Sequence, residues 1–104
     1  MQNKAIFFDR DGVINKLVKR NGNYFSPMNF KSFKVHDDVK LVTQKLKTLN
    51  FINIVISNQP DIARNLMDFS ELELMTNFLK KNTYIDDIFY CLHDDSSNCL
   101  CRKP

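Results

Sequence analysis

The sequence predicts an α/β fold, a Rossmann-like three-layer sandwich built on a parallel sheet, and three observations support this class. Short apolar runs suited to buried strands occur at residues 4–9, 51–57 and 84–91. Two segments between them repeat their apolar residues at helical spacing. The order strand–helix–strand–helix–strand requires right-handed crossovers, which make the strands parallel. A chain of 104 residues has room for one such domain, so residues 1–104 are treated as a single domain.

The three predicted strands are KAIFFD, FINIVIS and YIDDIFYC. In the first, the apolar residues are consecutive, which is typical of a central strand whose two faces are both covered. Residues 10–36 are predicted to be mostly loop, with NGN at 21–23 as a turn. Twelve asparagines accompany only two glycines, so either asparagine fills the tight turns or some turns have been lost.

The first helix is predicted to begin at Asp37 or Asp38. Helical spacing gives it an inner face made of Val39, Val42, Leu46 and Leu49. The second helix is predicted to begin near Ser70, where SELE forms a capping box with Glu73 at the third helical position. Its predicted inner stripe consists of Leu72, Met75 and Leu79.

Composition excludes some classes of function. The net charge of +3 includes no dense basic run, so no nucleic-acid partner is expected. The apolar stretches are too short to span a membrane, and no signal peptide follows Met1. We therefore expect a cytoplasmic protein with reduced thiols, in which three cysteines do not form a disulfide framework.

Polar segments follow all three predicted strands: DRDG after the first, SNQ after the second and a Cys/His segment after the third. Ligands of parallel sheets bind at the carboxyl ends of the strands. The three segments are therefore expected to meet at one site.

Asp9 and Asp11 lie two residues apart at the end of the first strand. Two carboxylates in one crevice repel each other unless a cation neutralises them, and oxygen ligands suit Mg²⁺. A carboxylate held on Mg²⁺ can also attack phosphorus and form an aspartyl-phosphate. The alternative is a solvated turn, because D-x-D-G is common in turns.

The segment CLHDDSSNCLCRKP carries four N/S side chains that can bind a metal. Cys91 and His93 are two residues apart, as are Cys99 and Cys101, so each pair can grip one ion from an extended backbone. Four such ligands in a reduced compartment favour a tetrahedral Zn²⁺ with no open position, which is a structural site. The alternative for a single pair is packing in the core.

The motifs FFDRDGVIN, ISNQ with IAR, and CxH with CxCRKP, in this order, resemble the haloacid dehalogenase superfamily of phosphatases. The arginine between the two aspartates and the Cys/His segment resemble its subfamily IIIA, the branch with D,D-heptose 1,7-bisphosphate and histidinol-phosphate phosphatases. The resemblance covers essentially the whole chain. It implies a phosphoric monoester hydrolase acting on a small phosphorylated substrate, with Mg²⁺ as cofactor and a structural zinc loop.

The resemblance also implies roles for single residues. Asp9 would be the nucleophile and a Mg²⁺ ligand. Asp11 would be the general acid and base, giving Mg²⁺ its backbone carbonyl. The residues implied to contact the phosphoryl group or the substrate are Ser57, Asn58, Gln59, Arg102 and Lys103. Positive charge and hydrogen-bond donors around a transferring phosphoryl group are what this chemistry needs.

The family's fourth motif, an acidic pair on a later strand that completes the Mg²⁺ site, is not among these residues. We expect the chain to be the N-terminal part of such a domain, with AIFF on an open sheet edge. That edge would favour self-association or a complementing chain. The sequence leaves two substrates open, heptose bisphosphate and histidinol phosphate. It also leaves open the choice between an active phosphatase and a catalytically inactive zinc-binding fragment.

Overall fold

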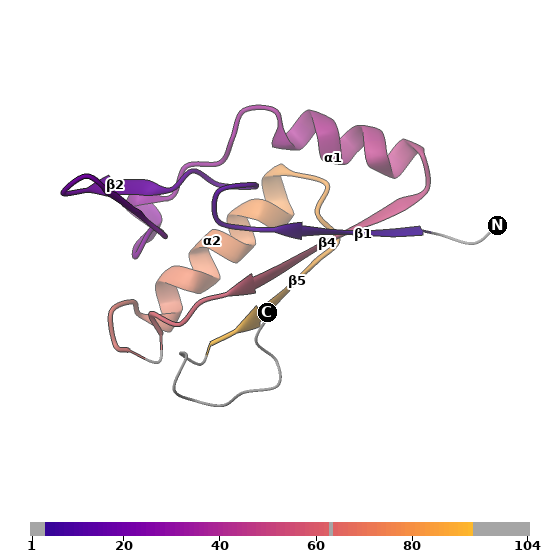
Figure 1. The fold of residues 1–104 in the computed structure, drawn as a ribbon. Helices are drawn as coiled ribbons and strands as arrows, with labels where there is room; N and C mark the ends of the chain where they lie inside the picture. Colours follow the sequence, from indigo (N-terminus) through magenta and orange to yellow (C-terminus); the bar gives the residue numbers. More distant parts are fainter. Residues whose placement is uncertain (1–3, 63, 93–104) are drawn as a thin grey trace.

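A computed structural model describes residues 4–62 and 64–92, and its centre is a parallel sheet (Figure 1). The sheet has the spatial order β1 (Lys4–Asp9), β4 (Phe51–Asn58) and β5 (Asp87–Cys91). Both neighbouring pairs are parallel, and their register places Asp9 beside Ile56 and Asn58 beside Cys91. The α/β class and the parallel sheet are confirmed, although β5 begins at Asp87 and not at residue 84.

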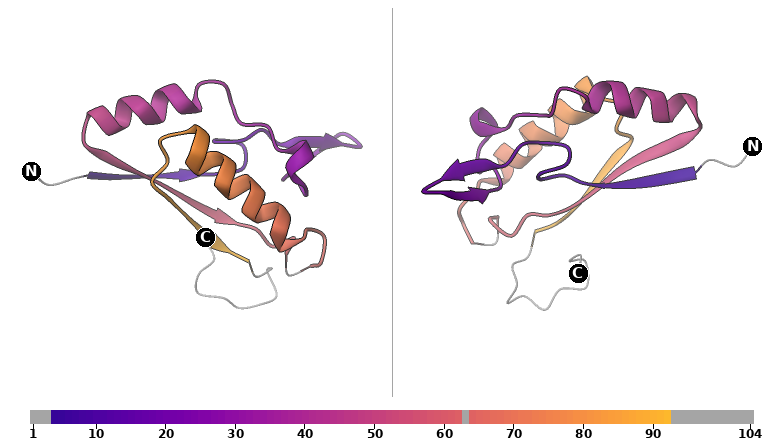
Figure 2. Two further views of the ribbon diagram at one scale, coloured as in Figure 1. Left: turned by 180° about the vertical axis from the view of Figure 1, so that it is seen from behind. Right: turned by 45° about the horizontal axis from the view of Figure 1, so that its top comes forward.

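Two helices, α1 (Val39–Thr48) and α2 (Phe69–Asn82), lie on the same side of the sheet (Figure 2). This follows from two right-handed crossovers that run in the same direction across the strands. On the other face, Phe7 and Phe89 are 60% and 56% exposed. Within the described residues the fold therefore has two layers, and no described element covers the second face of the sheet.

The core lies between the sheet and the helices. Strand β4 alternates, so that Asn53, Val55 and Ser57 point toward the helices and are buried. The buried amide of Asn53 donates to the carbonyl oxygens of Thr43 and Tyr84, at 3.0 and 2.9 Å. The apolar core comprises Ile14, Phe33, Val39, Val55, Met67, Leu72, Met75, Leu79, Ile85 and Ile88.

Helix α1 begins at Val39, one residue after Asp38, the later of the two predicted starts, and half of its predicted inner face was wrong. Val42 and Leu49 are 44% and 56% exposed, whereas Val39 and Thr43 are buried. The Thr43 hydroxyl accepts a hydrogen bond from the backbone N–H of Tyr84 at 3.1 Å. A polar residue therefore faces the chain that leads into β5, and this orientation turns Val42 outward.

Helix α2 has the predicted inner stripe, because Leu72, Met75 and Leu79 are all buried. The predicted capping box was wrong. The helix begins one residue earlier, at Phe69, and its N-cap residue, Asp68, makes no capping hydrogen bond through its side chain. Glu71 in the first turn instead accepts a hydrogen bond from the backbone N–H of Phe30, at 2.9 Å.

A short hairpin occupies part of the predicted loop. Strands β2 (Val18–Arg20) and β3 (Asn23–Phe25) pair antiparallel around Asn21 and Gly22. Both turn residues have positive φ, 50° and 81°, as a two-residue hairpin loop requires. The turn was predicted at this place; the two strands, three residues each and mostly exposed, were missed. The hairpin leads to the 3₁₀ turn η1 (Phe30–Ser32).

Candidate active site

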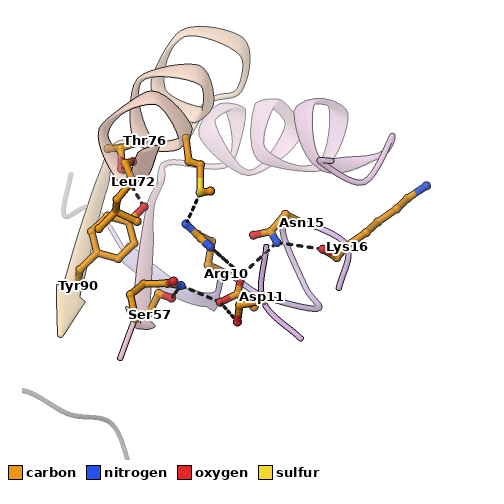
Figure 3. A network of polar contacts seen from close by, with 11 residues as sticks. Arg10, Asp11, Asn15, Lys16, Ser57, Leu72, Thr76 and Tyr90 are labelled. Carbon is orange, nitrogen blue, oxygen red and sulfur yellow. Dashed lines mark hydrogen bonds and ion pairs between the residues drawn. The ribbon is translucent and has the colours of Figure 1, made fainter. Parts of the chain in front are cut away.

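Predicted site residues from two strands meet at the carboxyl end of the sheet (Figure 3). Asp9 is the last residue of β1 and is exposed, and its partner in the register is Ile56 of β4. Ser57 is the next residue of β4 and is buried. The expectation that the segments after the first two strands share one site is therefore met for Asp9, Asp11, Ser57 and Gln59.

A tight turn after β1 brings Asp11 back over the end of the sheet. The carbonyl oxygen of Arg10 accepts hydrogen bonds from the N–H groups of Ile14 and Asn15, at 2.8 and 3.1 Å. Gly12 has φ +86°, which a residue with a Cβ rarely adopts. The glycine of DRDG therefore permits the turn that sets the direction of the Asp11 side chain.

The Asp11 carboxylate accepts five hydrogen bonds from four side chains. Oδ1 receives two from Arg10, Nη2 at 2.8 Å and Nε at 3.3 Å, and one from Asn15 at 3.0 Å. Oδ2 receives one from the Ser26 hydroxyl at 3.0 Å and one from the Gln59 amide at 2.7 Å. These donors come from the β1 turn, the segment after the hairpin and the end of β4, so Asp11 is fixed from three sides.

The same contacts set the protonation state of Asp11. Burial works to raise the pKa of this carboxyl group, but the charge and hydrogen bonds of Arg10 outweigh it. Hydrogen bonds from Asn15 and Gln59 act in the same direction. The pKa of Asp11 is therefore lowered below its ordinary value, and the side chain is a carboxylate at neutral pH.

Gln59 connects the two halves of the site. Its amide nitrogen donates to Asp11 and also to the Ser57 hydroxyl oxygen at 2.8 Å, and the residue is only 1% exposed. Its backbone N–H donates to the carbonyl oxygen of Cys91 at 2.7 Å. In this structure the side chain thus lies beneath the site and joins its polar groups, whereas Asn58 is partly exposed beside it.

Three residues of this network were not among the predicted site residues: Arg10, Asn15 and Ser26. The sequence did contain a signal for Arg10, which stands between the two aspartates. Asn15 closes the same turn and could have been inferred from its sequence separation of four residues from Asp11. Ser26 lies 15 residues from Asp11, across the hairpin, and nothing in the sequence indicated that contact.

The predicted zinc ligands are mostly outside the described residues, as are Arg102 and Lys103. Of the four, Cys91 is described: it ends β5 and is buried, and its sulfur takes part in a disulfide, which differs from the reduced thiols expected. His93, Cys99 and Cys101 lie beyond residue 92. Within residues 4–62 and 64–92, no three His, Cys, Asp or Glu side chains are grouped to hold a metal ion.

Comparison with known proteins gives consistent results. No family model matches the chain. It is 32% identical, over 98% of its length, to a D-glycero-beta-D-manno-heptose-1,7-bisphosphate 7-phosphatase of Helicobacter pylori strain J99. It is 34% identical, over 97%, to a D-glycero-alpha-D-manno-heptose-1,7-bisphosphate 7-phosphatase of Photorhabdus laumondii. The chain spans 59% and 58% of the length of these two relatives.

A solved structure agrees with the sequence relatives. It is a D,D-heptose 1,7-bisphosphate phosphatase from B. bronchiseptica, crystallised with magnesium and phosphate. The match has a TM-score of 0.78 and 25% identity, and it covers 96% of this chain and 56% of that one. The likeness therefore extends over nearly all of the present chain and a little more than half of its structural neighbour.

Proposed function

Because the chain belongs to the haloacid dehalogenase phosphatases related to the heptose-1,7-bisphosphate 7-phosphatases, we propose that it hydrolyses a small sugar phosphate through an aspartyl-phosphate. The substrate proposed is of the D-glycero-D-manno-heptose 1,7-bisphosphate type. One observation carries the proposal: an exposed carboxylate, Asp9, ends β1 next to Asp11, a second carboxylate held by five hydrogen bonds.

In the proposed reaction, an Asp9 oxygen attacks phosphorus and the bond from phosphorus to the leaving oxygen breaks. A proton from Asp11 neutralises the leaving alkoxide. Asp11 then removes a proton from water, whose oxygen attacks phosphorus and frees Asp9 and inorganic phosphate. The lowered pKa of Asp11 suits the second role directly, because a base must be unprotonated. For the first role it must take up a proton.

Magnesium is the proposed cofactor, and the described residues fit it in part. Asp9 offers an exposed carboxylate. The side-chain oxygens of Asp11 are already occupied by donors, so its backbone carbonyl is the group it would offer. Mg²⁺ at this place would neutralise charge on Asp9 and the phosphoryl group. Two ligands are few for Mg²⁺, and the family's further acidic pair is not in this sequence.

The other predicted contacts stay proposals. Ser57 is proposed to donate to the phosphoryl group, with Asn58 and Gln59 beside the substrate. Arg102 and Lys103 are proposed to supply positive charge to it. Strand β5, which precedes them in the sequence, pairs with β4 and ends at Cys91 beside Asn58, at the edge of the sheet where the site lies.

We further propose that the reduced chain binds one structural Zn²⁺ through Cys91, His93, Cys99 and Cys101. A thiolate ligand and a disulfide exclude each other at Cys91, so the two states can be separated by experiment. After reduction of the chain, one zinc ion per chain is expected, and Cys99→Ser should lower this stoichiometry. Retention of the disulfide under conditions that reduce other structural disulfides, with no zinc bound, would contradict the proposal.

Two other readings are tested by the same assay. The first alternative is a histidinol-phosphate phosphatase, which differs in its substrate. The second is a zinc-binding fragment with no catalytic activity. Phosphate release is measured with Mg²⁺ on heptose 1,7-bisphosphate and on histidinol phosphate, for the wild-type chain and Asp9→Asn. We expect turnover on the heptose substrate that is lost in Asp9→Asn. A folded, zinc-loaded chain with no turnover above the variant would favour the inactive fragment.

We also propose that the protein is located in the cytoplasm. Neither described helix has the length and hydrophobicity needed to cross a bilayer, within residues 4–62 and 64–92.

A further inference from the structure

Arg10 is a fully buried cation inside the site. Its side chain has no exposed surface, and its guanidinium donates twice to Asp11 Oδ1. The third contact of the guanidinium is from Nη1 to the sulfur of Met75 in α2, at 3.4 Å. Among residues 4–62 and 64–92, its polar contacts are therefore made inside the protein, and its counter-charge there is Asp11.

Aromatic rings complete the surroundings of the guanidinium. The Cζ atom of Arg10 lies 5.3 Å from the ring centre of Phe33 and 5.8 Å from that of Tyr90, both within cation–π reach. Phe33 follows η1, and Tyr90 is the penultimate residue of β5. Tyr90 is in turn fixed to α2, where its hydroxyl lies 2.9 Å from the hydroxyl oxygen of Thr76.

A buried arginine is costly unless its charge is paired and its N–H groups are bonded. An arginine that follows the nucleophile could be expected to bind substrate phosphate, but Arg10 has no surface from which to do so. The Nε and Nη2 groups of Arg10 contact one oxygen of Asp11, while Gln59 and Ser26 contact the other. Such a clamp fixes the direction of a carboxylate that must face a reacting group.

We propose that Arg10 is a positioning residue: it aims the Asp11 carboxylate and connects it, through the Tyr90 ring, to the end of β5. The proposal rests on the proposed function, since it names what orients the acid and base of that site. In this proposal Arg10 contacts Asp11 inside the protein and does not contact the substrate.

The kinetic test uses Arg10→Met, which replaces the guanidinium with an unbranched apolar side chain, and Arg10→Lys, which keeps the charge but loses the planar pair of N–H donors. Arg20→Met is the matched control, because Arg20 lies 4.4 Å from the ring centre of Phe25 in the exposed hairpin. We expect Arg10→Met to lower kcat about 100-fold with KM nearly unchanged. Arg10→Lys should recover little, and the control should have wild-type kcat.

A raised KM with unchanged kcat in Arg10→Met would overturn the proposal, since it would make Arg10 a substrate ligand. The Asp11→Asn background gives a second criterion. Arg10→Met should add little to the loss of kcat there, because the residue acts through Asp11. An equal loss of kcat in both backgrounds would also overturn the proposal.

Thermal unfolding decides the matter if the chain shows no turnover, so failure of the proposed function is distinguishable from failure of this inference. Asp11→Asn should lower Tm because it leaves Arg10 buried without a counter-charge. Adding Arg10→Met should then raise Tm again, by about 5 °C relative to Asp11→Asn alone. If the second substitution lowers Tm further, the two side chains are not coupled and the proposal is wrong.

Discussion

Asparagine replaces glycine in the turns of this chain. Among the described residues, those other than glycine with positive φ are Asn21, Asn50 and Asn65, at 50°, 68° and 59°. Asparagine tolerates this conformation better than other residues with a Cβ because its short polar side chain can bond locally. Of the two explanations left open by twelve asparagines and two glycines, the first is therefore confirmed at these three turns.

A substitution at Asn65 tests this explanation. Asn65→Ala should lower the free energy of unfolding by about 1 kcal/mol, because alanine resists positive φ, whereas Asn65→Gly should leave it unchanged or raise it slightly. Asn77→Ala is the control, since Asn77 lies on the exposed face of α2 where alanine is favourable. Urea unfolding measures all three variants. Equal effects of alanine at both positions would contradict the account.

The sequence predicted the positions of the candidate site residues better than the directions of their side chains. Asp9, Asp11 and Ser57 were found because each stands at the end of an apolar run, where chain direction alone determines the place. The burial of Gln59 beneath the site accompanies its hydrogen bonds to Asp11 and to the Cys91 carbonyl oxygen. The inward direction of Arg10 accompanies its contacts with Met75 of α2 and with Phe33. Neighbours so distant in the chain are not visible in local patterns.

Asp86 joins three elements just before β5. One carboxylate oxygen accepts from the Lys47 ammonium of α1 at 2.7 Å, and the other accepts from the backbone N–H of Asn53 in β4 at 2.7 Å. Burial acts to raise the pKa of Asp86, but the bonds from Lys47 and Asn53 lower it below its ordinary value of 3.8. The pKa of Asp86 is lower in the folded state than in the unfolded state. The contact therefore contributes its full stabilisation above the unfolded-state pKa. The stabilisation is lost as the pH falls through the folded-state pKa.

Asp86→Asn should therefore reduce the free energy of unfolding by about 1 kcal/mol at pH 7, and the difference from wild type should shrink toward zero on acidification below about pH 4. Asp87→Asn is the control, because the Lys80–Asp87 pair at 3.6 Å is about half exposed and should contribute little. Unfolding in urea across this pH range measures both. A difference for Asp86→Asn that persists unchanged at low pH would contradict the assignment.

Elements were predictable where their pattern was strong. The short apolar run of β4 gave its place to within one residue, and the stripe of α2 was found in full. The inner face of α1 was half wrong because Thr43, a polar residue, occupies a buried position through its hydrogen bonds. The hairpin strands were missed because three exposed residues carry no periodic signal.

At the scale of the whole molecule, the main unbalanced feature is the side of the sheet that no described element covers. Phe7 and Phe89 lie more than half exposed on the face opposite the helices, and β1 is one of the two edge strands of the described sheet. An exposed apolar face and an unpaired strand edge favour association. The sequence predicted the open edge, from the resemblance to a larger sheet, but the bare face became evident only once both helices were placed.

The 104-residue chain is therefore expected to self-associate through this face. Sedimentation velocity should show dimers or larger species for the wild type, and the double substitution Phe7→Ser and Phe89→Ser should shift the population toward monomer. Leu41→Ser is the control, because Leu41 is 69% exposed on α1, away from the sheet. If Leu41→Ser shifts the population as much as the double variant, association does not occur through the sheet face.

The most direct test of the central claim is to trap the phosphoryl group on Asp9. The chain is incubated with Mg²⁺ and heptose 1,7-bisphosphate and quenched in acid, and its peptides are analysed by mass spectrometry. The account predicts a phosphorylated peptide that contains Asp9 and is absent from Asp9→Asn. Phosphate release without modification of Asp9, or release that persists in Asp9→Asn, would contradict it.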